Sequence, residues 1–136
     1  MIRNIPNKVD QQMLKEYIDL TNYGTYDFLY LRMDFANHCN VGYCFINFIS
    51  VEAIITFVKA RVGKKWNKFK SEKICDASYA NIQGKKGLIE KFKNSNVMIQ
   101  DPSYRPKLYY CFGPLIGQEQ PFPLHGLSND ISFTNL

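Results

Sequence analysis

The sequence lacks the features that mark several classes of protein. No apolar run approaches the ~18 residues of a membrane span, and no signal-peptide pattern opens the chain. The four cysteines never form a C-x-x-C pair, so neither a zinc knuckle nor a redox motif is indicated. His38 and His125 have no second ligand at metal spacing. We therefore expect free thiols in a reducing, intracellular compartment and no membrane partner, bound metal or cofactor.

Motifs of catalysis are also missing. The chain contains neither G-x-G-x-x-G nor G-x-x-x-x-G-K-[ST], which rules out the common phosphate-binding loops. No pattern suggests a nucleophile beside a general base. We therefore expect a protein that is not an enzyme.

What the chain does have is apolar material and positive charge. Its 136 residues suit one domain, and 46% of them are hydrophobic and 15% aromatic, enough for a real core. The net charge is +5, and residues 59–73 hold seven basic side chains against one acid, Glu72. Such a cationic patch attracts nucleic acid or anionic lipid, although it can also be plain solvated surface.

The spacing of apolar residues predicts alternating strands and helices. Strands are expected over residues 1–5, 26–33, 42–49 and 74–80, and helices over 11–21, after Ser50 and after Gln83. Asp10 and Ser50 are suitable N-caps. The order is βαββαβ plus an appended helix. It predicts an α+β sandwich: a four-stranded antiparallel sheet with two helices on one face.

The second helix and the loop after it yield two further expectations. The Lys-rich segment 63–73 is predicted to be a loop that helps electrostatically without ordered contacts, with Trp66 as its packing anchor. The residues expected to form the buried stripe of the helix are Val51, Ile54, Ile55, Val58 and Val62.

The periodicity ends near residue 97, where five prolines and scattered aromatics begin. We expect a domain over 1–96 and an extension over 97–136 that partly packs on it, with the last dozen residues disordered in solution. The segment from Tyr104 to Phe112 is expected to pack against the domain. The alternative is that it extends a binding surface through Arg105 and Lys107.

Two aromatics, Tyr43 and Phe45, alternate on the third predicted strand. Side chains spaced by two stand on one face of a sheet, so both rings point outward, where they can stack successive bases. Gly42 beside them leaves room for a sugar-phosphate to approach the backbone. Cys44 faces inward.

Other outward residues extend this face. Arg3 and Asn4 lie on the first strand, and Asn47 lies on the third. On the second strand the same parity turns Tyr30 and Arg32 outward, with Phe28 beside them, and Leu29, Leu31 and Met33 inward; a slip of one residue would reverse this. The candidate RNA-binding residues are Tyr43, Phe45, Arg3, Asn4, Asn47, Tyr30 and Arg32.

The octamer Val41 to Phe48, VGYCFINF, resembles the RNP1 motif of the RNA recognition motif family. The family usually has Lys or Arg where Val41 stands, to contact a phosphate. Residues 1–5, MIRNI, resemble the companion RNP2 motif without its first residue, so that Met1 stands where a ring is expected. This resemblance implies the ferredoxin-like fold and binding of single-stranded RNA at moderate affinity. It also suggests a fragment of a larger protein.

Further phrases narrow the resemblance. Four segments are similar to the C-terminal RNA recognition motif of the Mei-two-like proteins of fungi and plants. They are IRNIPNK (2–8), YDFLYL (26–31), NVGY (40–43) and ANIQGK (80–85). That resemblance implies the RNA-binding module of a meiosis regulator, located in the nucleus or cytoplasm. Contacts with other regions of the parent protein would support its affinity. The alternative is a degenerate motif that has become a protein-interaction module.

Overall fold

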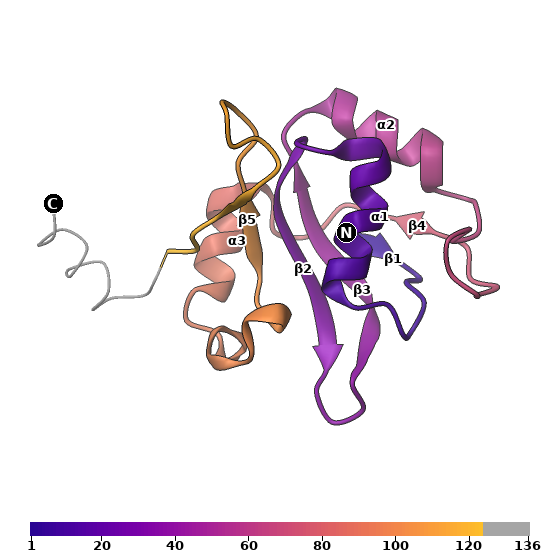
Figure 1. The fold of residues 1–136 in the computed structure, drawn as a ribbon, viewed down its shortest axis with the longest axis horizontal. Coiled ribbons are helices and arrows are strands. Elements are labelled where there is room, and N and C mark those ends of the chain that lie inside the picture. Colours follow the sequence, from indigo (N-terminus) through magenta and orange to yellow (C-terminus); the bar gives the residue numbers. More distant parts are fainter. Residues whose placement is uncertain (124–136) are drawn as a thin grey trace, which may run out of the picture.

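The computed structural model describes residues 1–123 and has a six-stranded antiparallel sheet in the order β4-β1-β3-β2-β5-β6 (Figure 1). Its elements are β1 (Ile2–Arg3), α1 (Gln11–Asn22), β2 (Tyr26–Asp34), β3 (Cys39–Phe48), α2 (Val51–Arg61), β4 (Asp76–Ala77), α3 (Gly84–Phe92), the 3-10 turns η1 (Asn96–Ile99) and η2 (Pro102–Tyr104), β5 (Lys107–Tyr109) and β6 (Glu119–Gln120). The predicted α+β class and the βαββαβ order followed by a helix are confirmed.

The helix starts follow from local chemistry. The Asp10 carboxylate accepts a hydrogen bond from the Met13 backbone N–H at 2.8 Å. The Ser50 hydroxyl accepts one from the Ala53 N–H at 3.1 Å. Each cap satisfies an amide that has no partner within its helix, so both predicted N-caps are correct.

The main core lies between the sheet and the helices α1 and α2. Leu29, Leu31 and Cys44 are fully buried there against Tyr17 of α1 and Phe57 of α2. The inward parity predicted for β2 and β3 is therefore correct.

The opposite face of the sheet is partly covered, which the sequence analysis did not anticipate. Helix α3 lies on the side of the sheet away from α1 and α2 (Figure 1). Its Leu88 and Phe92 form a second apolar cluster with Phe28, Tyr30 and Leu108, and Phe45 packs against that cluster. The sheet is thus enclosed on both faces where α3 crosses it.

The buried stripe predicted for α2 is wrong in part. Val51, Ile55 and Val58 are exposed, with 67%, 45% and 39% of their surface accessible. The residues of α2 that are buried are Ala53 and Phe57. The Phe57 ring fills the space that the aliphatic stripe was expected to fill. The helix is therefore oriented with several of its β-branched residues toward solvent.

The extension adds two strands, β5 and β6, to the sheet next to β2. Strand β5 pairs with β2 through Phe28–Leu108 and Leu29–Lys107, and β6 pairs with β5. The segment Tyr104 to Phe112 therefore packs on the domain. Residues 124–136, which include all of the terminal dozen predicted to be disordered, lie outside the described residues. Among the helices of residues 1–123, none is long and apolar enough to cross a membrane.

A cation holds the extension against α1. The Lys15 ammonium lies 4.7 Å from the ring centre of Tyr109 in β5 and 5.8 Å from that of Tyr26 in β2. It pairs with Asp19 at 2.5 Å, and Asp19 also accepts the Tyr26 hydroxyl proton in a hydrogen bond. One charged cluster thus joins α1, β2 and β5.

Candidate nucleic-acid interface

A row of side chains crosses the outer sheet face at the end that α3 does not cover. The register pairs Arg3 with Asp76 on one side and with Tyr43 on the other. Arg32 of β2 completes the row, because its guanidinium donates to the Tyr43 hydroxyl at 3.1 Å. We call Arg3, Tyr43 and Arg32 the open row. The row places one permanent positive charge on each side of a half-buried aromatic ring.

The aromatic pair of the RNP1-like octamer is split between two environments. The rings of Tyr43 and Phe45 lie 5.9 Å apart at an interplanar angle of 84°, an edge-to-face contact. Phe45 also packs 5.6 Å from Phe92 of α3. Phe45 therefore lies between two rings, whereas Tyr43 lies on its side away from Phe92.

Tyr30, predicted to be an outward RNA contact, points to the outer face but lies beneath α3. Only 5% of its surface is exposed, and its ring is 4.9 Å from Phe92. Desolvation by this burial raises the pKa of the Tyr30 hydroxyl. The predicted outward direction of Tyr30 is correct, but α3 covers its ring.

The two asparagines are engaged within the protein. Asn47 donates from Nδ2 to the Asp27 carboxylate at 2.8 Å. Asn4 donates to the Ile74 carbonyl at 3.2 Å and has a φ of 60°, in the left-handed region that asparagine tolerates better than most residues. Asn4 thus ties β1 to the residues before β4, next to Arg3.

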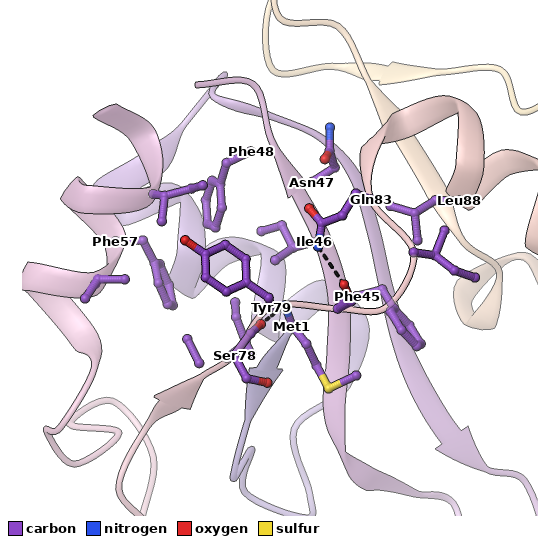
Figure 2. Close-up of a pocket in the computed structure, with 16 residues that line it drawn as sticks. Met1, Phe45, Ile46, Asn47, Phe48, Phe57, Ser78, Tyr79, Gln83 and Leu88 are labelled. Atoms are coloured by element: carbon purple, nitrogen blue, oxygen red, sulfur yellow. Dashed lines mark hydrogen bonds between the residues drawn. The ribbon is translucent and has the colours of Figure 1, made fainter. Parts of the chain in front are cut away.

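A mostly apolar hollow of about 310 Å³ opens beside this face, between β3, α2 and the segment that follows β4 (Figure 2). Phe48, Phe57 and Ile46 line it from the core side, and Phe45 lines it from the outer side. Tyr79 stands at its mouth with 89% of its surface exposed. Since its lining has no charged side chain, the hollow is suited to apolar contacts and not to phosphate.

Metal-binding and nucleophilic chemistry find no support in the described part of the chain. Residues 1–123 contain no group of three His, Cys, Asp or Glu side chains that could hold a metal ion. Burial raises the pKa of the Cys44 thiol to about 12, and that of Cys75 to about 12 as well. Both thiols are therefore protonated and unreactive near neutral pH.

Comparison with known families agrees with the motifs on β1 and β3. The family described as RNA recognition motif 2 matches residues 1–93, which include strands β1 to β4 and helices α1 to α3. The chain belongs to this family. It is a family of RNA-binding proteins and not of enzymes.

The relatives are much longer proteins. The chain is 69% identical over 123 residues to "Meiosis protein mei2" of Schizosaccharomyces pombe. This alignment covers 90% of this chain and 16% of the relative. It is 54% identical over 124 residues to "Protein MEI2-like 1" of Arabidopsis thaliana, covering 91% of this chain and 14% of the relative. It is also 51% identical over 127 residues to "Protein MEI2-like 2" of Oryza sativa subsp. japonica, covering 93% and 15%. The resemblance to the Mei-two-like proteins is thus confirmed, and this chain spans about a seventh of the length of these relatives.

Proposed function

We propose that this domain binds single-stranded RNA through the open row, as the RNA-binding module of a meiosis regulator that acts in the nucleus or cytoplasm. The observation that carries the proposal is the position of Tyr43 between two arginines on the part of the sheet that α3 leaves uncovered. Membership in the RNA recognition motif 2 family and the name of the fungal relative support it.

Each member of the row has a distinct role in this proposal. A base stacks on the Tyr43 ring, whose orientation is fixed by the hydrogen bond from Arg32. Arg3 and Arg32 contact the flanking phosphates or base edges. Phe45 supports Tyr43 from the side and adds apolar contact. The Nδ2 groups of Asn4 and Asn47 already donate within the protein, so in this proposal their contribution to RNA is limited to accepting hydrogen bonds through Oδ1.

The experiment is a fluorescence-anisotropy titration of a mixed-sequence single-stranded RNA of about ten nucleotides. Loss of one stacked base costs roughly 1–3 kcal/mol, so Tyr43→Ala should weaken binding by about tenfold. Phe112→Ala is the matched control, since this ring is 80% exposed but lies in the extension. Equal binding by both variants would reject the open row as the site.

Tyr43→Ala is a cleaner test than Phe45→Ala. Because Phe45 also packs on Phe92, removal of the Phe45 ring would disturb the packing of α3 on the sheet together with any RNA contact. Thermal melting of each variant establishes that the compared proteins are equally folded.

The alternative, a protein-interaction module, is favoured by one observation. Phe92 covers Phe45 and Tyr30, so the outer face is narrower than four open strands would give. This alternative gains support if RNA binding is abolished by moderate salt and is the same for the parent chain and Tyr43→Ala. In that outcome only general positive charge attracts the RNA.

A further inference from the structure

The loop between α2 and β4 presents an ordered group of lysines next to the open row. We define the basic loop as residues 62–75. Its lysines, which are all exposed, are Lys64, Lys65, Lys68, Lys70 and Lys73. The one acid of the loop, Glu72, pairs with Lys65 at 2.8 Å. For Lys68 and Lys70 no side-chain partner is found within residues 1–123.

An aromatic anchor fixes this loop. Trp66 is 1% exposed, and its ring lies 5.4 Å from that of Tyr17 in α1. The Phe69 ring also packs on Tyr17, with 5.5 Å between the ring centres, and the Tyr17 hydroxyl donates to Asn67 Oδ1 at 3.0 Å. This packing agrees with the predicted role of Trp66 as the anchor of the loop.

The two ends of the loop are joined through the backbone. The Gly63 N–H donates to the Cys75 carbonyl at 2.8 Å, and the Cys75 N–H donates to the Lys64 carbonyl at 2.8 Å. The lysines therefore project from a fixed backbone, and a ligand that binds them does not have to order the loop first.

The basic loop touches the turn that follows β1. Lys73 Nζ donates to the Asn7 side chain at 2.8 Å and to the Ile5 carbonyl at 3.3 Å. Asn4, directly after Arg3, donates to the Ile74 carbonyl. The basic loop therefore lies against the turn that follows Arg3, and Asp76 of β4 pairs with Arg3 in the sheet register.

We propose that the basic loop binds the sugar-phosphate backbone of the same RNA, beyond the nucleotides at the open row. The occupant is RNA and not an anionic membrane because the loop adjoins the open row, so that one strand can contact both. Lys68 and Lys70 are its main phosphate ligands, and Lys73 joins them to Arg3. This inference rests on the proposed function and assigns that site a second, sequence-independent part.

The test compares Lys68→Gln/Lys70→Gln with Lys86→Gln/Lys91→Gln, which removes the same charge from exposed positions of α3. Each is titrated with single-stranded RNAs of five and fifteen nucleotides at several salt concentrations. The loop variant should lose roughly fivefold or more affinity for the long RNA and less than about twofold for the short one. For the long RNA the slope of log K against log salt should fall by about 1.4, because each phosphate contact on a single strand contributes about 0.7.

The outcomes separate the two proposals. Equal losses in both double variants, or a loss independent of RNA length, would overturn the role of the loop. If Tyr43→Ala weakens binding to both RNAs while the loop variant binds both normally, the open row stands and the loop inference fails. If the loop variant shows its length-dependent loss while Tyr43→Ala has no effect, the loop stands and the open row fails.

A vesicle arm addresses the other polyanion. Sedimentation with vesicles containing about one third anionic phospholipid should show no loop-dependent binding at physiological salt. Binding that the loop variant abolishes, together with unchanged RNA affinity, would assign the surface to a membrane and overturn the proposal.

Discussion

At the scale of single residues, alternation on a strand predicts direction better than accessibility. Tyr43 and Phe45 both point outward, as their spacing requires, but one ring is half open and the other lies against Phe92. Leu88 and Phe92 are the buried residues of α3. The sequence contains no local signal for the face of the sheet on which that helix docks, because β2 is apolar on both faces and favours either choice.

A prediction at this scale concerns the buried thiols Cys44 and Cys75. Burial raises each pKa from its usual 9.0 to about 12 in the folded state. Above pH 9 the unfolded chain releases these protons while the folded chain keeps them, so stability falls as pH rises through this range. Between pH 8 and 9.5 we expect a loss of roughly 1 kcal/mol per thiol.

Urea unfolding at the two pH values measures this loss. Cys44→Ala/Cys75→Ala should show a clearly smaller decrease than the parent chain. The same decrease in both proteins would show that other groups, such as the buried tyrosines, control alkaline stability.

At the scale of elements, caps and periodicity predicted the order of strands and helices, but packing decided their extent and rotation. Strand β4 was expected over seven residues and forms over two, and Tyr79 and Ala80 after it line the hollow instead. In α2 the pattern of β-branched residues suggested a stripe, while Phe57 alone fills the core position. Competition of this kind between side chains depends on the partner element and cannot be found within one segment.

The extension provides a prediction at this scale. Tyr109 is 5% exposed and packs on Tyr26 at 5.3 Å under the Lys15 ammonium. Tyr109→Ala should lower the free energy of unfolding by about 3 kcal/mol, as for other buried aromatic truncations. It should also increase proteolytic cleavage near residues 110–118, because β5 loses its main contact with the domain.

Phe112→Ala serves as the control, since this exposed ring should change stability by less than about 0.5 kcal/mol. Limited proteolysis and urea unfolding provide the two measurements. Equal stability and equal cleavage in both variants would mean that pairing of β5 with β2 holds the extension without the aromatic cluster.

At the scale of the whole molecule, the second apolar cluster, which lies beneath α3, divides the outer face of the sheet into a covered and an uncovered part. The open row lies outside the area that α3 covers, so RNA does not need to move this helix. We predict that hydrogen exchange of the α3 amides changes by less than about twofold when RNA binds, while amides near Tyr43 become more protected. Amides of α1, on the opposite side of the sheet, provide the reference.

Loss of protection throughout α3 on RNA binding would contradict this prediction. It would show that RNA displaces Phe92 and reaches Phe45 and Tyr30, so that the functional interface is wider than the open row.

The order of the strands has a further consequence, for self-association. An uncovered edge strand offers free backbone amides and carbonyls to a neighbouring molecule, which is a common start of aggregation. The nine-residue strand β2 would be such an edge, but β5 pairs along part of it, and the outermost strands β4 and β6 have two residues each. The extension thus places a two-residue strand at one border of the sheet, and β4 keeps the other border equally short, so both borders offer few free backbone groups to a neighbouring molecule.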